Sequence, residues 1–458
     1  MSRDAMDLFS ALWPMAMLLV ALGFTGRSIR LPRRSQVAWL PWVVATIGLA
    51  IFAWKHWQLG VITSNELTHV FKPNRTWYSY LQEDPGNPGR LHRLFGLGLV
   101  PLGGLAGFRV LNMVVAVAAA GVLAASYRRI SGGAASLFAL LVLLEPTWMD
   151  RMWEARAYAF FLAASVLALW CWTDANERGK EGRIGGFLAV TAIACIENPL
   201  CIVLTVAGLL VWCRRRGVAS VSRSEWIALS SIVLMTVPMV LWALERHRSL
   251  SHQSDKAIWI LMGVGAGVGA AATLRRLPSA ATGELVLWAS ALVLAGLYLG
   301  FVPSVNRSVL FLFPWLGAAL LVLLPADWRV QTAALCFVVY GLVPGQWKRL
   351  NRNLQITQNK AEGARSLHES WGQQQTAPVV FRPQWAAPEY LSSLVDLRFA
   401  PYSSLEDGPT PLPPMYAPSE RGECTAGERG IAYIHGRQVC DCPVEMETKL
   451  WVAYACPE

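Results

Sequence analysis

The most informative feature of this 458-residue chain is how little charge it carries. Charged residues make up 15% of the sequence, whereas a soluble chain typically carries about 25%. Internal repeats, low-complexity tracts and a dedicated metal-binding motif are also lacking. Hydrophobic residues account for 54%, there are 21 tryptophans and the mean hydropathy is +0.38. These properties exclude an ordinary soluble domain and predict a polytopic membrane protein, in which the net charge of +10 serves orientation rather than nucleic-acid binding.

Long apolar runs predict where the chain crosses the membrane. They cover residues 10–24, 37–54, 107–127, 132–145, 155–173, 184–197, 199–213, 225–244, 256–274, 283–302, 307–324 and 328–344. Several are shorter than the about 20 residues that a full crossing needs. The 184–213 region fits either a broken hairpin or one long helix. The sequence therefore predicts an all-α bundle of about 11–13 transmembrane helices.

Arginine clusters predict the orientation of these spans. Five basic clusters recur in every second connection: Arg27/Arg30/Arg33/Arg34, Arg128/Arg129, Arg178/Lys180/Arg183, Arg214/Arg215/Arg216 and Arg275/Arg276. Basic residues are enriched in cytoplasmic loops, so we expect all five on the cytoplasmic side of a bacterial inner membrane. The N-terminus, the connections 55–106, 146–154 and 245–255, and the tail 345–458 then lie on the periplasmic side. The first span follows no positive segment and is not expected to be a removed signal peptide.

The tail differs in composition from the rest of the chain. It lacks long apolar runs, and "PVVFRPQW" and "RGIAYIHGRQVC" predict short strands. We therefore expect a transmembrane domain at 1–344, with 55–106 as its first periplasmic loop, and a small extracytoplasmic mixed α/β domain at 345–458. Four of the nine cysteines lie in this tail, at Cys424, Cys440, Cys442 and Cys456. They predict two disulfides with the pairing open, and a zinc site is the alternative.

Cations at the outer boundary are not explained by orientation. They are Lys55, Lys72, Arg75, Arg90, Arg93, Arg109, Arg151, Arg156, Arg246, Arg248, Lys256 and Arg307. Single members fit side chains that extend along lipid to reach water. Their recurrence on one side of the membrane instead suits a phosphate or pyrophosphate group on a lipid, because the guanidinium fork binds phosphate oxygens with two hydrogen bonds.

Carboxylates gather at the same boundary, at Glu66, Asp150, Glu154 and Glu197. Ionisable residues at membrane depth usually mark a functional site or an ion pair. Glu154 could simply pair with Arg151 or Arg156, and Glu66 could occupy the first turn of a helix capped by Ser64 or Asn65. The pair Glu197-Asn198, in the broken hairpin, either contacts the donor or satisfies free backbone groups. His69 and His92 fit polar loop residues.

Three segments, taken in order, resemble a known family. "PGRLHRLFGLGLVPLGGLAGFRVLNMV" contains Arg109, "DRMWEARAYAFFLA" contains Glu154, Arg156 and Tyr158, and "NRSVLFLFPWLGAALLVL" contains Arg307. They resemble motifs of the C-type integral-membrane glycosyltransferases, in the family 39-like branch that includes protein mannosyltransferases and the aminoarabinose transferase of lipid A. The "EARAY" stretch is the most specific of these motifs. The chain differs from the family in having Asn65 before Glu66, where aspartate is usual.

The resemblance implies inverting sugar transfer from a polyprenyl-phosphate donor to a hydroxyl of a glycan, lipid or protein. Glu66, with Asp150 as second choice, is expected to act as general base. The expected substrate-binding residues are Asn65, His69, Arg109, Glu154, Arg156, Tyr158, Glu197, Arg246, Lys256 and Arg307. The sequence identifies no cofactor with certainty, and a divalent cation such as Mg²⁺ or Mn²⁺ is left open. A lipid or solute transporter and an inactive member of the fold are the alternatives.

Overall fold

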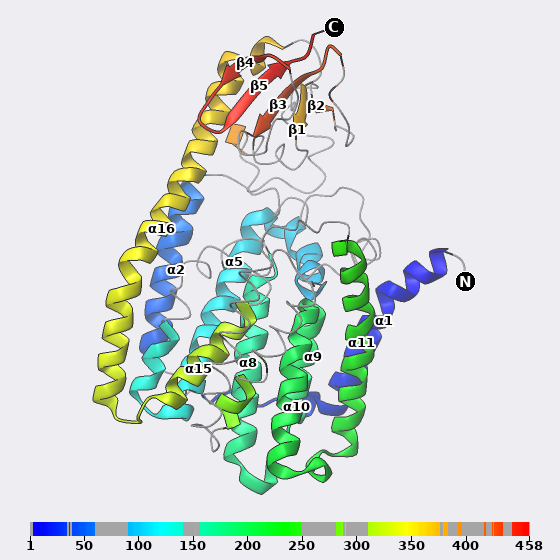
Figure 1. The fold of residues 1–458 in the computed structure, drawn as a ribbon, viewed down its shortest axis with the longest axis vertical. Coiled ribbons are helices and arrows are strands. Elements are labelled where there is room, and N and C mark those ends of the chain that lie inside the picture. The colour runs from blue at the N-terminus through cyan, green and yellow to red at the C-terminus, as the bar shows by residue number, and fades with distance from the viewer. Residues whose placement is uncertain are drawn as a thin grey trace.

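The fold is a helical bundle joined to a small C-terminal sheet (Figure 1). A computed structural model describes residues 3–33, 36, 39–59, 90–140, 152, 156–248, 281–286, 289, 310–375, 379–382, 390, 393–394, 416–417, 424, 426–433 and 442–457. The described helices are α1 (Arg3–Thr25), α2 (Trp39–Leu59), α5 (Arg90–Ser131), α8 (Tyr158–Glu177), α9 (Gly185–Glu197), α10 (Ile202–Arg216), α11 (Arg223–Arg248), α15 (Phe313–Leu323) and α16 (Trp328–Ser370).

The centre of the bundle is formed by α5, α8 and α9, which pack against one another. Two glycines allow neighbouring helices to approach closely. A β-carbon at Gly208 of α10 would lie 2.4 Å from the ring of Phe187 on α9, and one at Gly317 of α15 would lie 2.1 Å from the hydroxyl of Tyr127. That hydroxyl donates a 2.7 Å hydrogen bond to the carbonyl of Pro314. Small residues thus determine how near the helices of this core lie.

The 184–213 region forms a broken hairpin rather than one long helix. Helix α9 ends at Glu197, and a short 3-10 helix, η5 (Pro199–Cys201), precedes α10. The side chain of Asn198 accepts a 3.1 Å hydrogen bond from the backbone N–H of Leu200. Pro199 has no backbone N–H that needs an acceptor, and the Asn198 side chain accepts from the next one, so a new helix can begin here. Asn198 therefore satisfies a free backbone group, one of the two roles considered for it.

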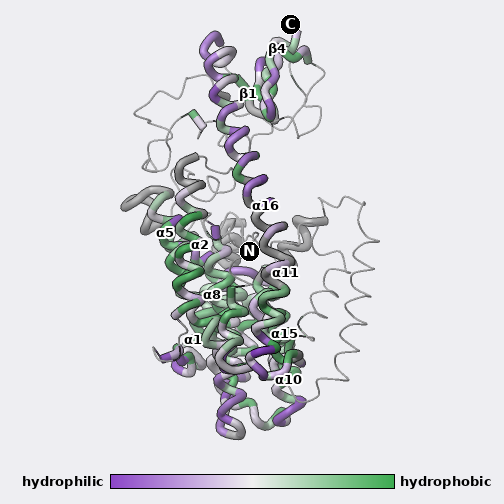
Figure 2. The backbone as a smooth tube through the Cα atoms, turned by 90° about the vertical axis from the view of Figure 1, so that its left-hand side faces the viewer, coloured by the Kyte–Doolittle hydropathy of each residue, from purple (hydrophilic) through white to green (hydrophobic). Residues whose placement is uncertain are grey.

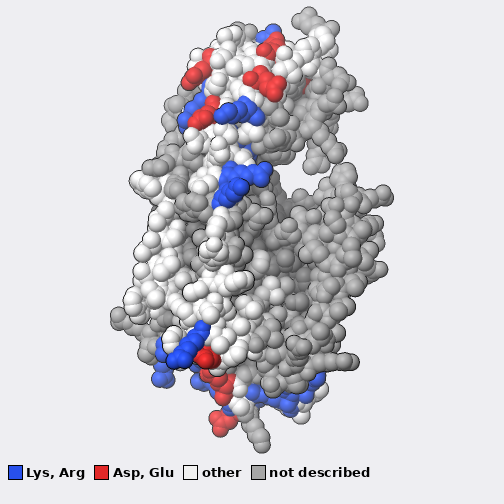
Figure 3. Space-filling model, turned by 60° about the vertical axis from the view of Figure 1, so that its left-hand side comes forward, with Lys and Arg blue, Asp and Glu red and all other residues white. Residues whose placement is uncertain are grey.

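The described basic clusters lie together at the end of the bundle opposite the sheet (Figure 3). The indole N–H of Trp170 donates to the carbonyl of Arg30, at 2.6 Å, which joins the ends of α8 and α1. Arg129 at the end of α5 forms a 3.2 Å ion pair with Asp174 of α8. Arg216 donates to carbonyls in the last turn of α8, and burial lowers the pKa of its guanidinium. The connections that carry these arginines are far apart in the sequence but lie at the same end of the bundle.

Two helices extend beyond the boundaries expected from hydropathy. The expected loop 55–106 is helical at both described ends, because α2 continues to Leu59 and α5 begins at Arg90. Helix α16 continues through the expected domain boundary at residue 344 and ends at Ser370. The sequence after Pro344 is rich in Gln, Lys, Arg, Leu and Ala, which favour helix even without apolar periodicity. One continuous helix therefore connects the bundle to the sheet.

The C-terminal sheet has the strand order β2-β1-β3-β5-β4. Its strands are β1 (Val379–Arg382), β2 (Tyr416–Ala417), β3 (Arg429–Tyr433), β4 (Val444–Glu447) and β5 (Trp451–Ala455). Strand β1 is parallel to both neighbours, while β3–β5 and β5–β4 are antiparallel. The two strands expected from the sequence are β1 and β3.

The last turns of α16 pack on this sheet. The indole N–H of Trp451 donates to the carbonyl of Lys360 at 2.9 Å. A β-carbon at Gly363 would lie 3.0 Å from the hydroxyl of Thr448, so glycine permits the close contact. Leu367 and Trp371 complete a small apolar core with Trp451. The end of α16 is therefore a structural part of the C-terminal domain.

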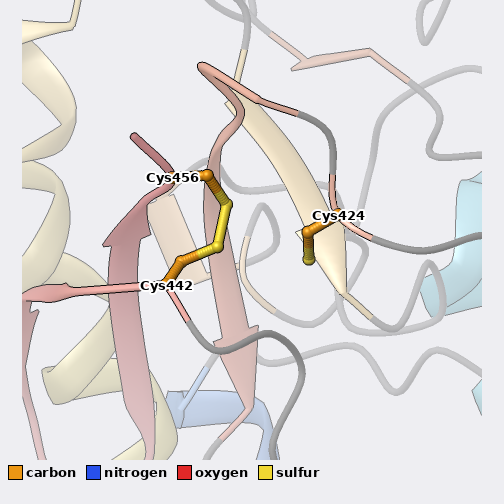
Figure 4. A group of neighbouring side chains, drawn as sticks. All are labelled: Cys424, Cys442 and Cys456. Atoms are coloured by element: carbon orange, nitrogen blue, oxygen red, sulfur yellow. A yellow bond between two sulfur atoms is a disulfide. The ribbon is translucent and has the colours of Figure 1, made fainter. Parts of the chain in front are cut away.

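A disulfide joins Cys442, which precedes β4, to Cys456, which follows β5 (Figure 4). It closes the open end of the β4–β5 hairpin, beside a 3.1 Å hydrogen bond from Ala455 N–H to the Pro443 carbonyl. Cys424 is also disulfide-bonded, and Cys440 lies outside the described residues. The expectation of a disulfide within the tail is thus confirmed for one pair.

Apolar residues dominate both the interior and much of the outer surface of the bundle (Figure 2). By length and composition, residues Ala106–Ser131 and Tyr158–Glu177 could each cross a membrane. Large apolar side chains are also exposed on the outer helices. They include Leu19 of α1, Trp39, Trp42 and Trp54 of α2, Val114 of α5, Leu234 of α11, Leu316 of α15 and Phe337 of α16. Soluble monomers rarely expose so many large apolar side chains together.

Removing the disulfide tests its contribution to the sheet. In the full-length protein, replacing Cys442 and Cys456 together by serine should destabilise the C-terminal domain by about 3 kcal/mol. The two cysteines are 14 residues apart in the sequence, and a disulfide that closes a loop of about this length contributes about 3 kcal/mol to stability. Limited proteolysis should then cleave this domain faster than in the wild type. Cys336→Ser, which removes an exposed free thiol, is the matched control. Equal cleavage rates in all three proteins would contradict a stabilising role.

Candidate functional site

The first part of α5 folds back on the rest of the helix. The rings of His92 and Phe108 are stacked with their centroids 4.2 Å apart, although a straight helix would separate these positions by about 24 Å. The sequence between them contains Pro101 and several glycines, which weaken or kink helices. The fold-back brings residues from both parts of α5 to the end of the bundle that faces the sheet (Figure 1).

Glu197 connects this folded segment to the end of α9. Its Oε1 atom accepts a 3.0 Å hydrogen bond from the backbone N–H of His92. Glu197 has 0% of its surface exposed and His92 has 2%. His92 lies in the first turn of α5, where the backbone N–H has no intrahelical acceptor, so a carboxylate there is favoured both as a cap and by the helix dipole. The expectation that His92 is a polar loop residue is wrong, because the fold-back buries it.

Aromatic rings surround the imidazole of His92. Besides the stacked ring of Phe108, the ring of Phe160 on α8 approaches edge-on, with centroids 5.3 Å apart. Phe95 contacts the same Phe160 ring at 5.6 Å. Rings from both parts of α5 and from α8 therefore form an apolar wall beside Glu197. This wall holds the fold-back in place.

Asn112 connects α5 to the start of α8. Its amide donates a 2.8 Å hydrogen bond to the backbone carbonyl of Arg156, and Asn112 is fully buried. Arg109 lies three residues earlier in α5, on the same helix face, and is also buried. Arg156 donates a 3.0 Å hydrogen bond to the hydroxyl of Tyr158, whose ring lies 5.2 Å from the guanidinium carbon. The described part of the "EARAY" segment, residues 156–158, is thus joined to the middle of α5.

These contacts and burials define a largely buried polar cluster, in which Arg156 is partly exposed and which we call the outer cluster. It consists of Arg90, His92, Arg109, Asn112, Arg156, Tyr158, Glu197 and Asn198. Its described members contain three arginines and one carboxylate. Both Arg90 and Arg109 are engaged in interactions within the fold. Such a cluster is suited to hold an anion, since guanidinium groups in a water-poor site interact strongly with phosphate oxygens.

The outer cluster contains only part of the predicted site. Arg109, Arg156, Tyr158 and Glu197 are described, and the structure brings the segments that carry them together. Glu66, Asp150, Asn65, His69, Glu154, Lys256 and Arg307 lie outside the described residues, as does the side chain of Arg246 on α11. Sequence reasoning did not select Arg90, His92 or Asn112 as site residues. In the sequence, an amide side chain three residues after Arg109 is a signal that could have identified Asn112.

Three sulfur atoms in the C-terminal domain lie within 4.8 Å of one another, on Cys424, Cys442 and Cys456 (Figure 4). This spacing is compatible with metal ligands. Zinc, however, binds cysteine as the thiolate, and all three cysteines are disulfide-bonded. The sulfur chemistry therefore favours the disulfide interpretation over the alternative zinc site.

Comparison of the chain with protein-family models, with curated proteins and with solved structures gives no match. The resemblance to C-type glycosyltransferases therefore stays a prediction from the motifs themselves.

The hydrogen bond between Asn112 and Arg156 can be tested by removing the amide. Asn112→Ala leaves a buried carbonyl without its donor, which should cost about 1–3 kcal/mol of unfolding free energy. The thermal midpoint of detergent-solubilised protein should fall accordingly. Ser126→Ala is the matched control, because the buried Ser126 hydroxyl donates to the carbonyl of Val122, one turn earlier in the same helix. An equal decrease in both variants would contradict a linking role for Asn112.

Proposed function

We propose that this protein is an integral-membrane glycosyltransferase that takes its sugar from a polyprenyl-phosphate donor on the periplasmic side. The observation that carries the proposal is the outer cluster. Arg90 and Arg109 are buried on the two parts of α5 that the His92–Phe108 stack brings together, and hydrogen bonds join these parts to Glu197 and to the Arg156 backbone. Arg109 and Arg156 are two of the residues in which the sequence resembles the C-type glycosyltransferases.

Several features support a membrane location with this orientation. Large apolar side chains are exposed on most outer helices, which water disfavours and lipid accepts. The basic clusters lie at one end of the bundle (Figure 3), as expected for a cytoplasmic side. The disulfide lies in the domain beyond the opposite end, and disulfides persist in exported segments. Two independent kinds of residue thus favour the same orientation.

The arginines of the outer cluster suit the departure of a phosphate. When the sugar leaves its lipid carrier, the bond between the anomeric carbon and the phosphate oxygen breaks. The electron pair stays on that oxygen, so negative charge increases there. Fixed guanidinium groups stabilise such charge without reorganising at the moment of reaction. In our proposal Arg156 has this role, and its hydrogen bond to Tyr158 keeps the guanidinium in position.

The acceptor hydroxyl needs a base as it attacks the anomeric carbon. We assign this role to Glu66, with Asp150 as second choice, because a carboxylate can take the hydroxyl proton while the new bond forms. Glu197 is less suited, since its Oε1 atom already accepts a hydrogen bond from His92 N–H. We instead assign Glu197 the task of positioning the fold-back of α5.

A donor-turnover assay tests the proposal. Membranes are given a radiolabelled polyprenyl-phosphate sugar, and release of the label from the lipid is measured. Glu66→Gln should lower turnover by roughly 10²–10⁴-fold if it is the base. Arg156→Gln should lower it by about 10²–10³-fold, since a charge-stabilising donor is lost. The control is Arg27→Gln, which removes an exposed arginine at the basic end and should leave turnover unchanged.

Two results of this assay would refute parts of the proposal. Full activity of both Glu66→Gln and Asp150→Asn would exclude the carboxylates as the base. Absence of turnover by the wild type with every donor tested would favour a transporter or an inactive member of the fold. Vesicles containing the protein and a fluorescent polyprenyl phosphate would then distinguish these two, because only a transporter moves the lipid between leaflets.

Reporter fusions test the proposed orientation. Alkaline phosphatase, which folds only after export, should be active when fused after Gln375 and inactive when fused after Gly217. Gly217 ends α10 at the basic end, and Gln375 follows α16 close to the sheet. Activity of the Gly217 fusion, or equal activity of the two fusions, would contradict the orientation.

A further inference from the structure

The first half of α16 has the length of a membrane crossing between two cationic positions. Arg329 is followed by a stretch without charged residues, and the next charged residue is Lys348. At the rise of an α-helix these two positions are about 28 Å apart, close to the roughly 30 Å thickness of a hydrocarbon core. The basic end of the bundle lies near Arg329, so Lys348 marks the opposite, outer boundary.

One exposed face of α16 changes from aromatic to cationic at this boundary. Phe337 is 80% exposed and Tyr340 is 84% exposed. Pro344, Lys348 and Arg352 follow at intervals of about one turn, and all three are exposed. Because residues three or four apart share a helix face, these side chains form a single stripe. We call the part formed by Lys348 and Arg352 the α16 cation pair.

No carboxylate neutralises the cation pair among the residues that the structure describes. The sequence contains no acidic residue between Asp327 and Glu362, and it adds a third cation at Arg349. The space-filling view shows Lys and Arg side chains gathered between the apolar bundle and the mixed charges of the C-terminal domain (Figure 3). Positive charge is unexpected at this end of the bundle, because basic residues of membrane proteins are enriched on the cytoplasmic side, which we assign to the opposite end.

We propose that the α16 cation pair binds the phosphate groups of anionic phospholipids in the outer leaflet. This inference rests on the membrane location proposed above, and not on glycosyl transfer. Phe337 and Tyr340 lie about two to three turns below Lys348. Their exposed rings are largely apolar, so acyl chains are their natural neighbours. Phosphates attached to those chains then lie at the level of Lys348 and Arg352. The positive charge of the pair is complementary to the negative charge of these phosphates.

Such binding would determine the height of the C-terminal domain. The end of α16 is fixed to the sheet by the Trp451 hydrogen bond to the Lys360 carbonyl and by the close contact at Gly363. A helix anchored to phosphates at Lys348 therefore holds the sheet at a constant distance from the membrane. The outer cluster lies at the same end of the bundle, so the anchor would also limit how far the sheet can move from it.

The test measures lipid binding by the full-length protein. Delipidated protein is titrated with phosphatidylglycerol or with phosphatidylcholine of the same acyl chains, and bound lipid is counted by native mass spectrometry. The double variant Lys348→Gln with Arg352→Gln should bind phosphatidylglycerol at least about tenfold more weakly, because each cation near an anionic surface contributes to affinity. Binding of phosphatidylcholine should not change.

Two further variants keep the result interpretable. The charge-preserving double variant Lys348→Arg with Arg352→Lys should bind like the wild type. Lys449→Gln removes an exposed cation of the C-terminal domain and should leave lipid binding unchanged. The proposal is overturned if the neutral double variant keeps its affinity for phosphatidylglycerol, or if Lys449→Gln weakens it equally. Sugar-donor turnover is not measured here, so a failure of this test leaves the proposed transferase untouched, and the reverse also holds.

Discussion

A single buried hydrogen bond, from the backbone N–H of His92 to the carboxylate of Glu197, organises the outer end of the bundle. It joins the last residue of α9 to the first turn of α5, and thereby fixes the folded-back segment that contributes Arg90. A buried carboxylate is costly unless it is hydrogen-bonded, while an uncapped helix start leaves backbone donors unsatisfied. The hydrogen bond therefore satisfies both groups, the buried carboxylate of Glu197 and the free backbone N–H of His92.

The fold-back itself follows from weak helix formers in a packed environment. Glycines and Pro101 lower the cost of bending α5, and the rings of Phe108 and Phe160 give the imidazole of His92 a place to pack. Arg109 and Asn112 can then face the start of α8, where Arg156 lies. The described part of the candidate site is thus a consequence of one bend and two buried hydrogen bonds.

The two ends of the bundle use charge differently. At the basic end, arginines satisfy backbone carbonyls and pair with acids such as Asp174, which joins the helix ends structurally. At the outer end, Arg90 and Arg109 of α5 are buried, and two further cations on α16 are exposed. The first arrangement is explained by helix packing. In our two proposals, the second arrangement also serves to hold phosphate-bearing lipids.

The sequence by itself determined the helical class, most helix positions, the presence of strands in the tail and the disulfide-forming character of its cysteines. These properties depend on local composition and on short residue patterns, so they can be predicted without knowing which residues contact one another. It also selected Arg109, Arg156, Tyr158 and Glu197. Only the tertiary structure decided that His92 is buried, that Asn112 joins α5 to Arg156, and that α16 extends into the C-terminal domain. These features depend on contacts between residues distant in sequence, and hydropathy carries no information about such contacts.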